Sequence, residues 1–277
     1  MIKAMTVADI VSFIEDNLEN KINIDIICDH TGYGRRYVQI IFKKHINMTL
    51  GQYIRYRRIT RAALLLRLTS SKIIDISFRL QFDSQQSFNR EFKKIVGLSP
   101  MQYRKSTDWD LKPILYSRTV DFKHPEPPDI CNIDNGVIDG SKFNYELDMM
   151  KYREPSPLRW KKIDAYLDKE DSSVWLLTKY KAGKKNLESI KIYTIIGREY
   201  SNDRHKDKSK LVKYESGLYV HMKYTGSKEK YLEKVNDLYL VTLPYYEIKR
   251  KDGCDIEIIK KNKNEYQCEI FIPIIKK

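Results

Sequence analysis

Two short stretches of this chain carry side chains suited to reading the edges of nucleic-acid bases. They are GYGRRYVQIIFKK, residues 32–44, and FDSQQSFNREFKK, residues 82–94. Arginine can donate two hydrogen bonds to guanine, and glutamine or asparagine can donate to and accept from adenine. If each stretch forms a helix, its apolar residues gather on one face and these polar residues on the other. The predicted outer faces are Arg35, Arg36, Gln39 and Lys43 in the first stretch, and Gln85, Gln86, Asn89, Arg90 and Lys93 in the second.

The two stretches belong to a module that recurs after 50 residues, so that Ile24-Asp25-Ile26 matches Ile74-Asp75-Ile76 and Gln52-Tyr53 matches Gln102-Tyr103. In each copy an apolar helix signal (NIDIICDH or IIDISFRL) precedes a short break (TGYG or QFDS) and a second helix. Helix, tight turn and helix with a polar outer face is typical of a helix-turn-helix. We expect positive φ at Gly32 and Gly34, helix N-caps at Asp83 and Ser84, and buried side chains at Val38, Ile41, Phe42, Phe88 and Phe92.

The segment between the copies explains their spacing. No proline or glycine interrupts residues 52–69, which predicts one continuous helix about 27 Å long at 1.5 Å per residue. Successive major grooves on one face of a duplex lie about 34 Å apart. Such a helix could therefore hold two recognition helices in adjacent grooves without a second protomer. Its predicted buried stripe is Ile54, Ile59, Ala62, Ala63 and Leu66.

The net charge of +14 is unevenly distributed. Residues 30–74 contain no acidic residue, whereas ten lysines and arginines occur there. A solvated surface normally mixes both signs, so this acid-free block indicates a binding surface for a polyanion. Its basic residues are Arg35, Arg36, Lys43, Lys44, Arg55, Arg57, Arg58, Arg61, Arg67 and Lys72.

Residues 7–105 resemble the DNA-binding domain of the AraC/XylS transcription activators, in the branch that contains MarA, SoxS and Rob. The motifs that carry the resemblance are GYGRRYVQIIFKK, LGQYIRYRR, LRLTSSKIIDIS and FDSQQSFNREFKKIVGLSPMQYRKS. The resemblance implies binding to double-stranded promoter DNA and contact with RNA polymerase. It also implies base contacts at Arg36, Gln39 and Ile40, and base or backbone contacts at Gln85, Gln86, Ser87, Asn89 and Arg90. With Arg35, Lys43, Arg55 and Lys93, these form the predicted DNA-contacting set.

Two positions depart from the family pattern. Arg36 stands where close relatives carry tryptophan, and Ile40 stands where they carry an arginine that reads a base. Isoleucine cannot donate a hydrogen bond, but it could pack on the methyl group of thymine. Alternatively, a slightly rotated helix would bury Ile40 beside Ile41. Because of these departures, the operator sequence of the family does not transfer to this chain.

The second half of the chain has a different pattern. We expect an all-α DNA-binding domain over residues 1–106, with helix-turn-helix subdomains at about 7–50 and 70–105 and a linker helix at about 51–68. A linker at 107–119 and an α+β domain over 120–277, an antiparallel sheet with two helices, should follow. Strands are predicted at SVWLLTKY, SIKIYTIIG, GLYVHMKY, CDIEIIK and QCEIFIPI, and helices at SPLRWKKIDAYLDKE and SKEKYLEKVNDLYLVTL.

This second domain resembles the GyrI-like domains, chiefly through its end, TLPYYEIKRKDGCDIEIIKKNKNEYQCEIFIPIIKK. The resemblance implies a groove that binds amphipathic small molecules, with a glutamate at Glu269. Aromatic candidates for the groove walls are Trp175, Tyr219, His221, Tyr224 and Tyr145, although such residues also build cores. No metal or cofactor site is predicted, because the four cysteines (Cys28, Cys131, Cys254 and Cys268) are scattered and lack CxxC spacing.

These patterns favour a sequence-specific transcription activator in the bacterial cytoplasm, associated with the nucleoid. No apolar run approaches the roughly 20 residues that span a bilayer. A nonspecific architectural DNA-binding protein is a second hypothesis, consistent with the charge and with the absence of a base-reading arginine at position 40. A third is a GyrI-like hydrolase in which Glu269 acts as a base with His221 as its partner, but no nucleophile pattern supports it.

Overall fold

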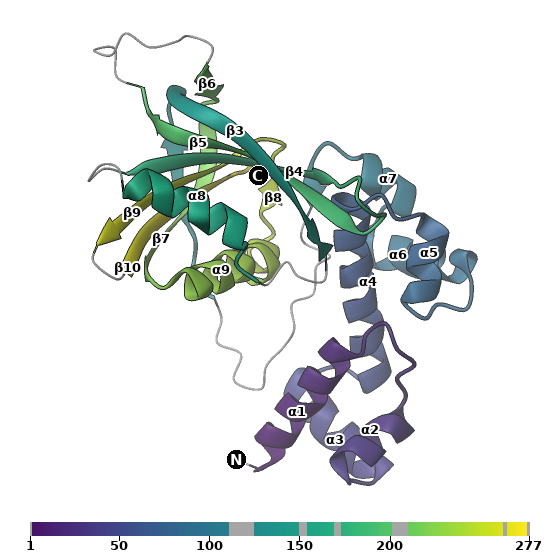
Figure 1. Cartoon of the computed structure of the whole chain (residues 1–277). Coiled ribbons are helices and arrows are strands. Elements are labelled where there is room, and N and C mark those ends of the chain that lie inside the picture. Colours follow the sequence, from purple (N-terminus) through teal and green to yellow (C-terminus); the bar gives the residue numbers. More distant parts are fainter. Residues whose placement is uncertain are drawn as a thin grey trace. The chain divides into compact units, whose positions relative to one another are not determined.

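The computed structural model describes residues 2–110, 125–149, 154–168, 173–200, 210–262 and 265–275 of the 277-residue chain. Its residues cluster into two compact units (Figure 1). The N-terminal unit consists of Met1–Arg67 and Ser71–Lys105, and the C-terminal unit consists mainly of Ser106–Leu111 and Glu126–Lys277. In the described ranges no helix is long and apolar enough to cross a membrane.

The N-terminal unit is helical, as predicted. Each copy of the repeated module forms two helices joined by a tight turn, and a 19-residue helix connects the copies. The helices are α1 Ile2–Asp16, α2 Ile24–Thr31, α3 Arg35–Ile46, α4 Leu50–Leu68, α5 Ile73–Arg79, α6 Gln85–Val96 and α7 Pro100–Lys105.

Local signals define the turn of the first copy. The side chain of Asn23 caps α2 by accepting a hydrogen bond from the backbone amide of Ile26 at 2.9 Å. Gly32 ends this helix with φ of 72°, a left-handed conformation that suits glycine. Gly34 was expected to share this conformation, but its φ is −69°, and it is the extended residue before α3. One left-handed residue is therefore enough to reverse the chain.

The second copy makes its turn without glycine. Gln81 takes the left-handed conformation, with φ of 60°. Ser84, and not Asp83, is the N-cap of α6, and its side chain accepts from the amide of Ser87 at 3.1 Å. The core of this copy is a chain of aromatic rings whose centroids lie 5.2–5.6 Å apart, formed by Phe82, Phe88, Phe92 and Tyr103.

The connecting helix α4 is continuous, and its predicted stripe is buried. Ile54, Ile59, Ala62, Ala63 and Leu66 are all at most 6% exposed. The first end of α4 packs in the core of the first copy, where Tyr53 lies against Phe42 with ring centroids 5.5 Å apart. Its other end contacts the second copy, where Arg104 Nε donates to the carbonyl oxygen of Leu66 at 3.2 Å and Arg67 Nη1 donates to that of Tyr103 at 3.2 Å.

The C-terminal unit is a curled, antiparallel eight-stranded sheet covered on one face by two helices, which confirms the predicted layers (Figure 1). All five predicted strands and both predicted helices are present. The strand order is β2-β7-β10-β9-β4-β5-β3-β6. These strands are β2 Asp129–Ile133, β3 Gly136–Asp148, β4 Val174–Ala182, β5 Ser189–Glu199, β6 Leu211–Tyr214, β7 Gly217–Gly226, β9 Asp255–Asn262 and β10 Glu265–Pro273.

The helices of this unit lie against the apolar face formed by Val174, Leu176, Ile196, Ile259 and Cys268. Each begins at a serine N-cap, Ser156 or Ser227. A π-helical turn continues the second helix; such turns are rare and frequently found at functional sites. The elements are α8 Pro157–Leu167, α9 Lys228–Asp237, the π-helix η3 Leu238–Thr242 and α10 Leu243–Tyr245.

A further strand lies inside the segment predicted to be linker. Strand β1, Trp109–Asp110, pairs with β8, Lys249–Arg250, and Trp109 is only 9% exposed. The ring of Trp109 lies 6.4 Å from that of Tyr239. The chain therefore passes from the last helix of the N-terminal unit into the C-terminal unit within four residues. The rest of the predicted linker after β1, residues 111–119, lies outside the described residues.

Candidate nucleic-acid interface and effector site

Helix α3 presents the polar face that its sequence predicts. Val38, Ile41 and Phe42 are at most 3% exposed, because their spacing places them toward α1 and α2. The opposite face is open to solvent. Arg35, Arg36, Gln39 and Lys43 are all exposed.

Ile40 lies on the exposed face of α3. Its side chain is 56% exposed, which excludes the rotated helix that would bury it beside Ile41. Arg36 and Lys43 flank it one turn away on the same surface. An exposed isoleucine among cations on a recognition helix is an apolar contact point within a positively charged face.

Helix α6 presents a second polar face, with Gln86, Arg90 and Lys93 exposed. Gln85 and Ser87 are half-buried, because they form the first turn of the helix beside its cap. Asn89 was expected to point outward but is also half-buried. Its Oδ1 atom is buried and accepts no hydrogen bond from the described part of the chain.

Several arginines of the acid-free block have partners inside the protein, which corrects the view of the whole block as a polyanion surface. Arg57 donates from Nε to Glu15 Oε1 at 2.6 Å, and both side chains are nearly buried. Arg58 donates to the carbonyl oxygens of Leu18 and Asn20 at 3.0 and 2.8 Å. The acidic partners lie outside the block in sequence, so its composition alone could not reveal these pairs.

The cations of the predicted DNA-contacting set lie on α3 and α6, apart from Arg55 on α4. Arg55 lies 3.8 Å from Glu91 and Arg35 pairs with Asp25, although both arginines are largely exposed. In the described part of the chain no ion pair is found for Arg36, Lys43, Lys44, Arg90, Lys93 or Lys94. The positive surface is thus concentrated on α3 and α6, where it flanks the base-reading residue types.

In the C-terminal unit two predicted effector residues are in contact. His221 Nε2 lies 2.8 Å from Glu269 Oε2, and its Nδ1 lies 3.1 Å from Asp129 Oδ2. The imidazole stacks on Phe271 with ring centroids 4.3 Å apart. Both polar atoms of the ring therefore have partners, and Glu269, on the uncovered face of β10, remains 39% exposed.

The other predicted groove residues do not form one site. Trp175 and Tyr219 share an apolar cluster on the sheet face that also carries Phe271. Tyr224 lies on the opposite face, packed against Tyr231 beneath the helices, and its hydroxyl is buried without a hydrogen-bond partner in the described residues. Alternation along strand β7 already separates Tyr224 from Tyr219 and His221, because it lies an odd number of residues from both. Tyr145 is half-buried on β3.

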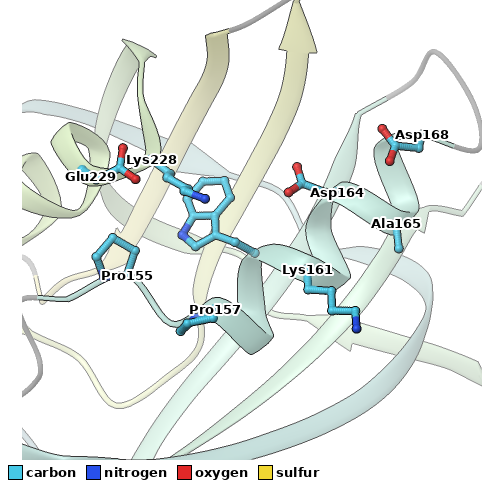
Figure 2. Close-up of a pocket in the computed structure, with 9 residues that line it drawn as sticks. Pro155, Pro157, Lys161, Asp164, Ala165, Asp168, Lys228 and Glu229 are labelled. Atoms are coloured by element: carbon cyan, nitrogen blue, oxygen red, sulfur yellow. The ribbon is translucent and has the colours of Figure 1, made fainter.

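A pocket of about 620 Å³ lies between the two helices of this unit (Figure 2). Pro155, Pro157 and Trp160 supply apolar walls. In Figure 2 the side chain of Asp164 points toward Lys228 and Glu229, whereas that of Lys161 points away from them. Asp164 is held in place by the hydroxyl of Tyr266, which donates to its Oδ1 at 2.6 Å. The charged lining consists of Lys161, Asp164, Asp168, Lys228 and Glu229, none of which sequence reasoning had singled out.

Two buried carboxylates on β9 were also missed. Glu257 is 3% exposed; Arg159 Nη2 donates to both of its oxygens at 2.6 Å, and the hydroxyl of Tyr231 donates at 2.8 Å. Burial, the largest single influence, disfavours the charge on Arg159, but Glu257 together with Tyr145 and Tyr180 raises the pKa of Arg159 well above its usual value. Burial beside Glu257 also raises the pKa of Tyr231. The signal in the sequence was two acidic residues alternating with isoleucines in Asp-Ile-Glu-Ile-Ile, the first half of β9.

Asp255, two residues earlier on the same face, is fully buried. It accepts hydrogen bonds from the Tyr239 hydroxyl at 2.5 Å and from Arg250 Nη2 at 2.9 Å. Burial, followed by the nearby Asp255 charge, raises the pKa of Tyr239 well above its usual value. Both carboxylates of β9 are therefore already satisfied by partners from the same unit.

The described residues hold no group of three or more histidine, cysteine or acidic side chains that could bind a metal. The four cysteines are free thiols. Burial raises the pKa of the Cys268 thiol to about 12, which suits a packing role within the core.

Comparison with known proteins agrees with the helical geometry. Residues 27–106 match a family model described as a helix-turn-helix domain. The chain is 38% identical to the F1 operon positive regulatory protein of Yersinia pestis, over 99% of this chain and 89% of that protein. It is 46% identical to the HTH-type transcriptional activator AarP of Providencia stuartii, over 36% of this chain and 74% of that protein.

A third relative matches the full length of this chain. The transcriptional regulator Rob of Salmonella typhimurium is 26% identical over 99% of both proteins. Relatives of this kind therefore cover both units, and they are named as regulators. From the two helix-turn-helix copies, the matched domain model and the relatives that span the chain, we conclude that it belongs to the AraC-type family of helix-turn-helix transcriptional regulators.

Proposed function

We propose that the chain binds promoter DNA as a monomer by placing α3 and α6 in successive major grooves, and that it activates transcription. One observation carries this proposal: both helix-turn-helix copies lie in one compact unit on a single uninterrupted helix, each with an exposed face of base-reading residues. A 19-residue helix spans about 28 Å, which suits the separation of adjacent grooves.

Activation is proposed from the relatives, two of which are named as a positive regulatory protein and a transcriptional activator. An activator that binds beside a promoter acts by contacting RNA polymerase, so the polymerase is the proposed protein partner. The predicted DNA contacts remain those of α3 and α6, with Arg55 as a contact to the backbone between them.

The direct test is selection of the purified full-length chain against a random duplex library of about 25 base pairs at near-physiological salt. We expect two enriched blocks separated by about one helical turn. Enrichment in one block alone would mean that the other copy holds only the backbone. Tight, salt-sensitive binding without any enrichment would contradict the proposal and favour the architectural protein.

The exposure of Ile40 leads to a prediction about the block bound by the first copy. Replacing its thymines one at a time by deoxyuridine removes only a methyl group. If Ile40 packs on such a methyl, one of these substitutions should weaken binding about fourfold, the equivalent of about 0.8 kcal/mol for one buried methyl or methylene group. The measurement is competition binding by fluorescence anisotropy.

Ile40→Ala provides the matched test for this contact. In that variant the deoxyuridine substitution should have no effect, while substitutions in the other block should act as in the parent protein. An equal deoxyuridine penalty in the parent and in Ile40→Ala would show that another side chain contacts the methyl. No penalty at any thymine would show that Ile40 makes no such contact.

The C-terminal unit is proposed to be a GyrI-like sensor whose effector site is the pocket between α8 and α9. The pocket combines an aromatic and proline-lined wall with three carboxylates and two lysines. This lining suits an amphipathic organic amine, whose ring would pack on Trp160 and whose ammonium would pair with Asp164 or Glu229. By contrast, the polar atoms of the His221 ring already have partners on its own sheet.

Phenethylamine and its uncharged N-acetyl derivative distinguish this proposal from nonspecific binding. We expect the amine to quench tryptophan emission saturably and the N-acetyl derivative to do so at least about tenfold more weakly, because it lacks the charge. Asp164→Asn should remove this preference, whereas Asp134→Asn in the exposed β2–β3 turn should retain it. Equal binding of both compounds, or of neither, would reject an amine site here.

A further inference from the structure

The two helix-turn-helix copies touch each other directly at the loop between α1 and α2. Glu19 belongs to the first copy, yet two of its polar groups contact the second. Its Oε2 accepts a hydrogen bond from Arg79 Nε at 2.7 Å, and its carbonyl oxygen accepts from Gln81 Nε2 at 2.8 Å. Both donors lie at the end of α5 or in the turn that leads to α6.

The same loop is attached to the connecting helix. Arg61 Nε on α4 lies 3.7 Å from Glu19 Oε1, an ion-pair distance. Arg58, one turn earlier on α4, donates to the carbonyl oxygens of Leu18 and Asn20 on either side of Glu19. The side chains of Glu19, Arg61 and Arg79 are 27%, 15% and 21% exposed, so water screens these charges only partly. The loop is thus held by α4 while it holds the second copy.

The contacts of Glu19 with Arg79 and Gln81 lie where they can limit rotation of the second copy about α4. The connecting helix sets both the separation and the rotation of the two copies, but it can twist and bend, and contacts between the copies away from its axis limit that movement. Gln81 has φ of 60° and lies four residues before α6. A turn of the second copy about α4 would separate Gln81 and Arg79 from Glu19. These two contacts therefore oppose that rotation, while Arg61 and Arg58 hold the loop on α4.

We propose that Glu19 is the positioning residue that sets the relative rotation of the two recognition helices, and so the half-site spacing that the protein accepts. This inference rests on the proposed binding of two grooves by one chain. One base pair more or less between the half-sites turns one groove by about 34° relative to the other. If the relative rotation of the two copies is fixed, both recognition helices cannot enter their grooves on the altered spacer. If the copies can rotate relative to one another, both helices can still bind.

The test uses the full-length chain and the selected operator, together with operators whose central spacer is one base pair longer or shorter. The parent protein should lose at least about tenfold in affinity on either altered spacer, because only one copy then fits well. Glu19→Ala and Arg79→Ala should bind the selected operator more weakly and should discriminate among the three spacers by less than about threefold. Unchanged discrimination in both variants would overturn the proposal.

Two variants control for a general loss of stability. Glu15→Gln removes the nearly buried partner of Arg57, which joins α1 to α4 without reaching the second copy. It should lower thermal stability yet retain the full spacing preference. Asp16→Asn, at an exposed position, should change neither property. Loss of the preference in Glu15→Gln would show that it depends on stability, contrary to a specific role of Glu19.

Hydrogen exchange without DNA separates failure of this inference from failure of the proposed function. In Glu19→Ala the backbone amides of residues 80–84 should exchange faster than in the parent, while those of α3 should not change. Unchanged exchange at residues 80–84 would show that the contacts of Glu19 with Arg79 and Gln81 do not hold the second copy, whatever the DNA results. If exchange is faster but the parent protein is insensitive to spacing, Glu19 does hold the two copies together. In that case both the two-groove binding and its control by Glu19 are rejected.

Discussion

Arg159→Met is expected to lower the free energy of unfolding of the C-terminal unit by about 3–5 kcal/mol, the usual cost of leaving one member of a buried ion pair without its partner. Arg159 and Glu257 have side chains 12% and 4% exposed, and Arg159 donates to both carboxylate oxygens at 2.6 Å. Methionine fills similar space but cannot donate a hydrogen bond. Among the described residues, Glu257 would then keep only the hydroxyl of Tyr231 as a donor.

Denaturation monitored by tryptophan emission is well suited to this measurement. The three tryptophans of the chain, Trp109, Trp160 and Trp175, all lie in the C-terminal unit, so their signal does not report on the helix-turn-helix copies directly. Circular dichroism at helical wavelengths should detect a separate, unchanged transition of the N-terminal unit if the two units unfold independently.

The double variant Arg159→Met/Glu257→Leu is the matched control. Replacing both members of a buried pair by apolar residues is often neutral or stabilising, so most of the lost stability should return. A single variant that costs less than about 1 kcal/mol would contradict the burial of this pair. If the double variant is as unstable as the single one, the unpaired charge of Glu257 is not the cause of the lost stability. The loss would then come from the missing packing of the Arg159 stem on α8.

Local patterns were sufficient to predict the helix-turn-helix copies from the sequence. Val38, Ile41 and Phe42, and again Phe88 and Phe92, have the spacing of one buried helix face, and all five are buried. The repeat at 50 residues strengthened this interpretation because two copies had to satisfy the same pattern. The exposure of Ile40 was left open because one residue of helical rotation decides it.

Features that depend on distant partners could not be predicted in this way. The arginines of α4 look alike in the sequence, but Arg57, Arg58 and Arg61 face the end of α1, about 40 residues away. The basic block therefore overstated the surface available to DNA. Only the tertiary arrangement shows that exposed cations such as Arg36, Lys43, Arg90 and Lys93 lie on α3 and α6.

The sheet shows the same division between local and distant information. Strands rich in isoleucine, such as β5 and β9, were predicted, whereas β3 was missed because its sequence GVIDGSKFNYELD has few apolar residues. Gly140 of β3 lies opposite Gly197 of β5, and a Cβ on Gly197 would lie 2.0 Å from the carbonyl oxygen of Asp139. These glycines permit a close approach that strand propensity cannot show.

Removing the guanidinium of Arg90 should distinguish base recognition from backbone binding at the second recognition helix. If Arg90 donates its fork to a guanine, Arg90→Ala should cost about 1–3 kcal/mol, or about 5–150-fold in affinity, and relax the preference at one base pair. Lys93 is one turn removed on the same exposed face. As a phosphate contact, it should behave differently: Lys93→Ala should weaken binding to all sequences alike and reduce the salt slope by about one.

The experiment is a salt series for each variant on the selected operator and on operators with a single changed base pair. Arg90→Lys is the informative control, because lysine keeps the positive charge but lacks the planar fork that matches guanine. It should retain the salt slope of the parent and still lose the base preference. If instead Arg90→Lys restores both affinity and preference, Arg90 acts as a point charge near a phosphate. Base reading by α6 would then have to come from Gln86 and its neighbours in the first turn.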